Sequence, residues 1–141
     1  MTAKEYLGQA YRLENKIRLQ QRRIAELREL ATSVSSPGFE EHYSATGNLD
    51  APFVKTLERI MEYQEEADKR IVLLLDLREQ IRTGIDEMES PDEALVIEHR
   101  YIYNMSWADI GIELNADERT VRRWHNKALS HYPIPENPIK I

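Results

Sequence analysis

The sequence contains no cysteine and only five glycines in 141 residues. Without cysteine the chain can form no disulfide and has no thiolate to act as a nucleophile or metal ligand. Few glycines, together with abundant alanine, leucine, glutamate and arginine, favour helices. No apolar run approaches the roughly 20 residues of a membrane-spanning helix, and the first residues lack the apolar core of an export signal. We therefore expect an all-α protein of the cytoplasm, with no membrane segment.

The residue patterns of common enzymes are also missing. There is no glycine-rich phosphate loop and no nucleophile elbow. The four histidines lack metal-ligand spacing, and the many carboxylates have no distinctive setting for acid–base work. We therefore expect no catalytic residues, no cofactor and no metal site.

The charge of the chain is acidic overall, with a net value of −6. A surface that binds polyanions everywhere is therefore not expected. Residues 118–129 depart from this balance, because they carry four basic side chains against Glu118. Any contact with nucleic acid must be concentrated in this segment.

The first 31 residues are predicted to form one amphipathic helix. Thr2 and Glu5 have the spacing of a capping box. Apolar residues then recur with alternating steps of three and four, which is the spacing of a coiled-coil seam. The seam comprises Tyr6, Ala10, Leu13, Ile17, Gln20, Ile24, Leu27 and Ala31.

A second seam runs from Phe53 to Met88, after a connection over residues 32–50 that is rich in Gly, Ser and Thr. Two long helices joined in this way predict an antiparallel hairpin. One hairpin cannot cover both seams and the additional apolar residues beside them, so we expect a homodimer or higher oligomer formed through residues 1–89. The alternative is a monomer whose hairpin folds onto its own C-terminal part. The apolar residues beside the seams are Leu7, Leu30, Val54, Leu75 and Leu77.

A second module is predicted from Ser90 onward. Ser90, followed by proline and an acidic pair, is typical of a helix start, and a short helix is expected over 94–103. After a turn at Asn104, Ser106 and Asp109 form another capping box. Three prolines exclude a helix over 132–141, which we expect to be an extended tail. The predicted organisation is a hairpin over 1–89, a small helical domain over 90–131 and this tail.

Residues 107–124 have the spacing of two short helices that cross at a steep angle. Gly111 provides the small residue needed where the backbones touch. Asn115 tolerates the left-handed conformation of the turn, and Asp117 can cap the second helix. The stripe Val121, Trp124 and Ala128 is predicted to be buried. This pattern predicts a helix-turn-helix.

If that stripe faces inward, the basic residues of the second helix face outward. Arginine can bind guanine edges or phosphates, and asparagine can pair with adenine. The predicted DNA-binding residues of the helix over 117–129 are Arg119, Thr120, Arg122, Arg123, Asn126 and Lys127. His125 is expected to be partly packed or to contact a phosphate, and Trp107 to pack against Tyr101 and Tyr103.

The segment RYIYNMSWADIGIELNADERTVRRWHNKAL, residues 100–129, resembles region 4 of sigma-70-type factors. With the opening YLGQAYRLENKI, residues 6–17, the chain is similar to phage-encoded regulators of the RinA/ArpU type. This resemblance implies control of transcription in an infected bacterial cell, with Arg119, Arg122, Arg123 and Asn126 as recognition contacts. The other regions of a sigma factor are missing, and contact with the host RNA polymerase is left open.

Two functions are therefore carried forward. The first is a sequence-specific DNA-binding transcriptional regulator of the phage late-gene type, with its recognition helix in the major groove of double-stranded DNA. The alternative is a phage DNA-packaging factor similar to a small terminase subunit. A coiled-coil adaptor is a weaker third reading, because it leaves the cluster of arginines unexplained.

Overall fold

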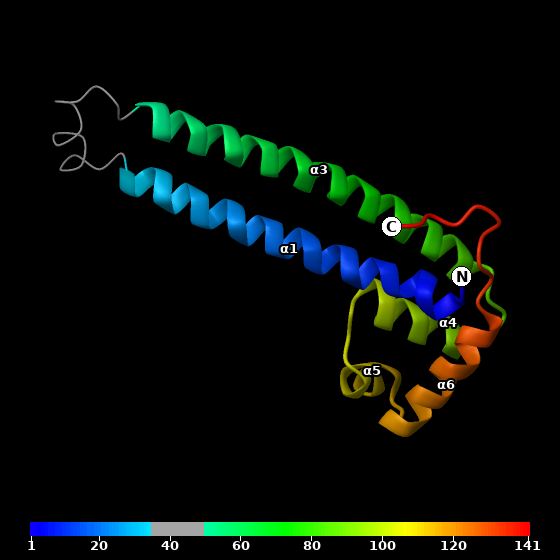
Figure 1. The fold of residues 1–141 in the computed structure, drawn as a ribbon. Helices are drawn as coiled ribbons and strands as arrows, with labels where there is room; N and C mark the ends of the chain where they lie inside the picture. The colour runs from blue at the N-terminus through cyan, green and yellow to red at the C-terminus, as the bar shows by residue number, and fades with distance from the viewer. Residues whose placement is uncertain (35–49) are drawn as a thin grey trace. The chain divides into compact units, whose positions relative to one another are not determined.

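The structure is a computed structural model that describes residues 1–34 and 50–141. These residues form helices and no strand, which confirms the predicted all-α class. Most of the predicted connection, residues 35–49, lies outside the described residues. The helices, traced in Figure 1, are α1 (Ala3–Val34), α3 (Asp50–Asp86), α4 (Pro91–Ile97), the π-helix η1 (Glu98–Ile102), α5 (Trp107–Leu114) and α6 (Glu118–His131).

The chain divides into two compact units, and both contain parts of α1 and α3. The first unit consists of residues 1–14 and 73–141, and the second unit consists of residues 15–72. The sequence placed its module boundary near residue 90, whereas the first unit joins the start of α1 and the end of α3 to all the later helices.

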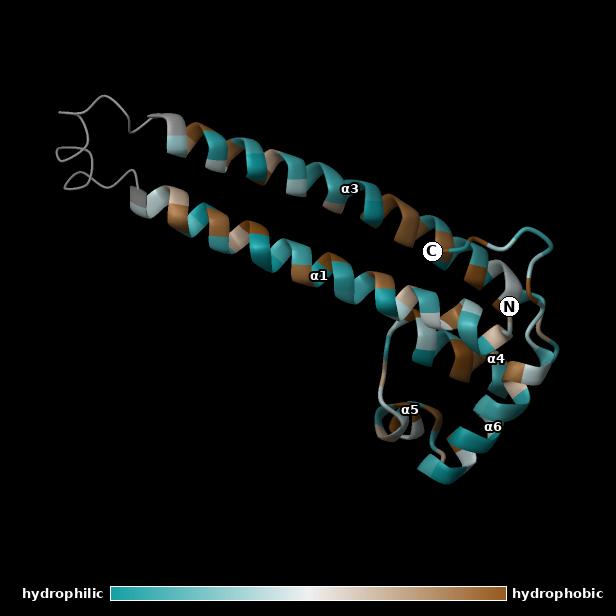
Figure 2. Cartoon of the chain, viewed as in Figure 1, coloured by the Kyte–Doolittle hydropathy of each residue, from teal (hydrophilic) through white to brown (hydrophobic). Residues whose placement is uncertain are grey.

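The second unit is an antiparallel helical pair, as the hairpin prediction required. Ile24 of α1 packs with Ile60 and Ala67 of α3, and the partly buried Leu27 and Tyr63 cover this cluster. The buried side chains repeat with the predicted heptad spacing, and Figure 2 shows hydrophobic residues recurring along both helices. The first seam is correct in both units, because Tyr6, Ala10, Leu13, Ile17, Gln20, Ile24 and Ala31 are all buried.

The polar residue within the first seam joins the two helices. The Gln20 amide donates to Glu66 over 2.9 Å, and its oxygen accepts from Arg70 over 2.6 Å. A buried polar group with satisfied partners fixes which residues lie opposite each other, because a shifted register leaves it unpaired. Gln64 is a polar residue of the second seam, and it donates to Asp68 on its own helix over 3.0 Å.

The first unit accounts for part of the surplus apolar surface seen in the sequence. Leu7 and Leu77 are both fully buried within this unit. Leu30, Val54 and Leu75 remain exposed, at 60%, 46% and 57%. The chain therefore covers some of these residues itself and leaves others open to solvent.

The end of α6 is attached to α3 through Tyr132. Its hydroxyl donates to the carbonyl oxygen of Ile81 over 3.0 Å, and its ring lies 6.1 Å from that of Tyr6. Gly84 provides the space, because a Cβ there would lie only 2.4 Å from the Tyr132 hydroxyl. Any larger residue at position 84 would displace this tyrosine.

Residues 132–141 contain no helix, in line with their prolines, and two glutamines bind the backbone of this tail. Gln80 of α3 donates to the carbonyl of Asn137 over 3.0 Å and accepts from the N–H of Ile139 over 2.9 Å. Gln9 of α1 donates to the carbonyl of Ile139 over 2.9 Å and accepts from the N–H of Ile141 over 2.8 Å. The tail is therefore held along its length by side chains from both long helices.

The short helix predicted over 94–103 begins earlier and changes geometry within its length. Ser90 caps it by accepting from the N–H of Glu93 over 3.4 Å, and the π-helical turn η1 follows α4. The chain then turns at Asn104, whose φ of 53° is left-handed. Its side chain donates to Glu14 of α1, which fixes the turn against the start of the first helix.

Candidate functional site

The turn between α5 and α6 has the geometry that the sequence predicts. Ser106 caps α5 by accepting from the N–H of Asp109 over 3.1 Å. Asn115 ends α5 in the left-handed conformation, with φ 51° and ψ 46°. Gly111 lies at a close approach of backbones, since a Cβ there would lie 2.7 Å from the carbonyl oxygen of Ala116. The close neighbour is thus the turn that leads into α6.

Asp117 starts α6. Its carboxylate accepts from the N–H of Thr120 over 2.7 Å. Hydrogen bonds from the side chain and the N–H of Thr120 lower the pKa of Asp117, and the nearby charges of Arg119 and Arg123 lower it further. The cap therefore stays ionised at neutral pH, where a carboxylate interacts favourably with the positive end of the helix dipole.

The inner face of α6 packs on the core of the first unit, with one difference from the prediction. Val121 and Ala128 are fully buried, and Val121 packs with Val96 and Ile110. The third buried residue is His125, which is 7% exposed. Trp124, predicted at the centre of this stripe, is only partly buried and packs at the edge of the cluster.

His125 is a core residue. Its Nε2 lies 2.7 Å from the Tyr101 hydroxyl, and its ring contacts that of Trp107 edge-on with centroids 4.6 Å apart. Burial lowers the pKa of His125 to about 4, with smaller contributions from the charges of Arg100 and Lys4. The imidazole is therefore neutral at pH 7.

The surroundings of Trp107 also differ from the prediction. It packs against His125 and within the cluster of Val121, and the Arg100 guanidinium lies 4.2 Å from its ring centroid. Tyr103, an expected partner, is 60% exposed and lies against His99 instead.

The outer face of α6 forms a shallow polar hollow of about 600 Å³. Five of the six predicted DNA-binding residues line it, together with the capping carboxylate. The lining residues are Asp117, Arg119, Thr120, Arg122, Arg123 and Asn126. Residues spaced over two and a half turns of one helix thus present a single surface, opposite the buried face.

The three arginines of this surface are not equivalent. Arg122 is engaged, because its Nη2 lies 2.7 Å from Glu118 and its guanidinium carbon lies 5.9 Å from the Trp107 ring centroid. Arg119 and Arg123 are exposed and have no ion-pair partner among residues 1–34 and 50–141. The sequence did not predict this pairing, although the step of four from Glu118 to Arg122 is a spacing at which helical residues meet.

Lys127, the sixth predicted residue, lines a different hollow. That hollow is largely acidic and also includes Glu87, Glu89, Glu93 and His131. Glu93 is buried and lies 3.0 Å from the imidazole of His131. Lys127 therefore faces carboxylates of its own chain and is separate from the arginine surface.

Within the part of the chain that the structure describes, no helix is long and apolar enough to span a membrane. The same residues contain no group of three histidine or carboxylate side chains that could hold a metal ion.

Comparison with known proteins gives one match. The model of the family described as "Protein of unknown function (DUF722)" matches residues 12–132. No curated protein and no solved structure matches the chain.

Proposed function

The chain belongs to the DUF722 family, and we propose that it is a sequence-specific DNA-binding regulator of transcription. In this proposal α5, its turn and α6 act as a helix-turn-helix, and α6 enters the major groove of double-stranded DNA. Arg119, Arg123 and Asn126 contact base edges or phosphates, and Arg122 joins them once it leaves Glu118.

The observation that carries the proposal is the exposed surface of α6. Among the described residues Arg119 and Arg123 have no ion-pair partner, and Asn126 and Thr120 add hydrogen-bonding groups to the same surface. The buried residues Val121 and Ala128 fix the direction of this surface. A helix that presents arginine and asparagine on one exposed surface is suited to a major groove, which admits an α-helix.

The resemblance of residues 100–129 to region 4 of sigma-70-type factors supports the same assignment. It would make the protein similar to phage regulators of the RinA/ArpU type. The left-handed Asn115 and the close approach at Gly111 are features that a tight turn between two such helices requires.

We further propose that the protein is a homodimer that pairs through the long helices. Leu19, Leu30 and Met61 of the second unit are exposed by 49%, 60% and 70%. These exposed apolar side chains are the surface that we propose for pairing. A two-fold dimer would read two inverted half-sites about one helical turn apart.

The test is selection of fragments of the source genome by the purified protein, followed by footprinting and titration of the selected duplex. Arg119→Ala and Arg123→Ala should each weaken binding roughly five- to tenfold at about 0.1 M salt and lower the salt slope by about one unit. Arg22→Ala, which removes an equally exposed arginine from α1, is the matched control. The proposal is wrong if no fragment is enriched, or if both α6 variants bind like the control variant.

Light scattering on the same protein separates regulation from DNA packaging. A dimer supports the regulator, whereas a ring of about eight or more subunits would support the packaging alternative, which uses the same helix. Two inverted half-sites in the footprint would support the symmetric dimer independently.

A further inference from the structure

The first unit contains a third hollow of about 750 Å³, lined by residues from α1, η1, α5 and α6. Three cations line this cleft, Lys4, Arg12 and Arg100, against a single carboxylate, Glu5. Glu5 is already engaged, because it accepts from the N–H of Thr2 over 3.0 Å as half of the capping box. The cleft is therefore positively charged, although the protein as a whole is acidic.

The cations of the cleft are available to a ligand. Lys4 and Arg12 have no ion-pair partner among the described residues, and both are exposed. Arg100 is fixed in place by donating to the carbonyl of Met105 over 2.8 Å. The charges of Arg100 and Lys4 both help to lower the pKa of His125, so both act on the inner end of the cleft.

A glycine in α1 opens the wall of this cleft. Gly8 lies inside a long helix, where glycine costs about 1 kcal/mol relative to alanine. It lines the cleft, and a Cβ there would lie 3.3 Å from Nη1 of Arg12. The missing side chain lets the guanidinium of Arg12 lie close to the helix and keeps the space in front of it free.

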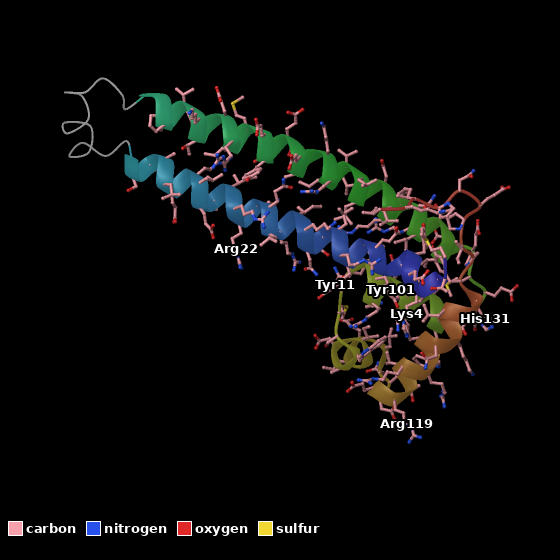
Figure 3. The ribbon with its side chains drawn as sticks, viewed as in Figure 1. Lys4, Tyr11, Arg22, Tyr101, Arg119 and His131 are labelled. Atoms are coloured by element: carbon pink, nitrogen blue, oxygen red, sulfur yellow. The ribbon has the colours of Figure 1, made fainter. Side chains whose placement is uncertain are left out.

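Trp107 lies close to one cation of the cleft and to one arginine of the α6 surface. Trp107 lines the cleft, with Arg100 of the cleft 4.2 Å from its ring centroid and Arg122 of the outer face 5.9 Å from it. Figure 3 labels Lys4, Tyr11 and Tyr101 of the cleft and Arg119 of the α6 surface. The same indole is thus a neighbour of one cation from each basic surface.

We infer that this cleft receives the phosphodiester backbone of the duplex whose major groove α6 enters, with Lys4 and Arg12 of α1 contacting its phosphates. The inference rests on the proposed DNA-binding function and extends it to α1, whose first turns become part of the DNA-binding surface. Backbone phosphates suit this surface because lysine and arginine neutralise them without regard to base sequence.

The experiment uses the full chain and a fluorescein-labelled duplex of random sequence, with binding followed by anisotropy from low to moderate salt. The double variant Lys4→Ala/Arg12→Ala is compared with Lys16→Ala/Arg22→Ala, which removes the same charge from exposed positions of α1 that do not line the cleft. We expect the cleft variant to lose roughly five- to tenfold in affinity per contact at about 0.1 M salt and to lower the salt slope by about two units. The conservative variant Lys4→Arg/Arg12→Lys should restore most of this loss.

The inference is overturned if the cleft variant and the control variant have the same DNA affinity and salt slope, with unchanged thermal unfolding. Binding through α6 would then survive in both variants. If Arg119→Ala weakens binding and the cleft variant does not, the inference is likewise overturned. Titration with AMP tests whether the cleft binds a free nucleotide instead of DNA. If the cleft variant abolishes AMP binding but leaves the salt slope of DNA binding unchanged, the cleft is assigned to a free nucleotide. If the wild-type chain binds no duplex, the proposed DNA-binding function is wrong. That outcome differs from one in which only the cleft variant behaves like its control.

Discussion

The two faces of α6 differ in what their residues contact. On the inner face, Val121, His125 and Ala128 are buried, and their neighbours are other residues of the first unit. On the outer face, Arg119 and Arg123 are exposed and have no ion-pair partner among the described residues. The inner face makes contacts that stabilise the fold, and the outer face has the groups that a nucleic acid would need.

The 14 residues of α6 therefore contribute to stability through one face and, in our proposal, to DNA binding through the other. Burying a side chain of the size of valine stabilises a fold by roughly 1.5–3 kcal/mol, whereas an exposed ion pair contributes about 0–1 kcal/mol. Substitutions on the outer face should therefore change binding and leave unfolding nearly unchanged. Substitutions on the inner face should change both, because binding needs the folded helix.

The largest difference in the free energy of unfolding is expected when aspartate is introduced on the inner face and, in a second variant, on the outer face of α6. Val121→Asp places an unpaired carboxylate in the cluster with Val96 and Ile110, and should lower the free energy of unfolding by roughly 4 kcal/mol. Arg123→Asp changes an exposed residue and should leave it within about 0.5 kcal/mol, while abolishing DNA binding by charge reversal. Urea unfolding followed by circular dichroism measures both. Similar losses of stability in the two variants would remove the distinction between the faces.

A smaller effect is expected from the titration of His125. Its pKa is about 4 in the folded protein and roughly 6.5 when unfolded. Between these values the unfolded chain binds a proton that the folded chain does not. The stability present above pH 6.5 should therefore fall as the pH is lowered to 4, by roughly 3 kcal/mol at most.

Urea unfolding at several pH values tests this expectation. His125→Gln should flatten the curve between pH 4 and 6.5, although its stability at pH 7 should be lower. Tyr101→Phe removes the hydrogen bond to the imidazole but keeps it buried, so this variant should retain the slope. A slope that persists in His125→Gln would assign the pH dependence to other groups.

The smallest effect concerns the one engaged arginine of the outer face. Glu118→Gln releases Arg122 and removes a negative charge from the arginine surface. DNA affinity should rise roughly two- to fivefold at low salt, and stability should change by about 0.5 kcal/mol or less. Anisotropy titration measures the affinity, with Glu62→Gln on α3 as the control. An unchanged or weaker affinity would mean that Glu118 positions Arg122 for binding.

Local signals in the sequence were sufficient for the two long helices and for the caps of the short ones. The seam through Leu13 and Ile24 follows from a repeat of seven, and the caps at Ser106 and Asp117 follow from short spacings. The left-handed Asn115 was predictable because few residue types adopt that conformation readily. Each of these features depends on residues within a few positions of one another.

One position of the stripe on α6, Trp124, was assigned incorrectly because hydrophobicity was given more weight than helix geometry. At about 100° per residue, His125 lies roughly 40° from Val121, and Trp124 lies roughly 60° away on the other side. Ala128 lies between them, so both flanking positions were candidates. The core around Tyr101 and Trp107 places the imidazole inside, and no local pattern encodes that packing.

Features that depend on distant residues could not be read from the sequence. Lys127 was included in the DNA-binding set because it shares a helix with the arginines, but Glu87 and Glu93 surround the hollow that it lines. The role of Gln9 and Gln80 in holding the tail requires knowledge of which helices meet. The basic cleft could not be predicted either, because Lys4 and Arg100 are far apart in the sequence and are brought together only by folding.

The glutamine contacts with the tail also bear on the order in which the protein folds. Gln9 bonds Ile141 across 132 residues of chain, whereas Gln20 and Glu66 in the second unit are separated by only 46. Closing the longer loop costs more chain entropy and comes later than local pairing. We therefore expect the contacts between Gln9 and the tail to form after α1 and α3 have paired in the second unit.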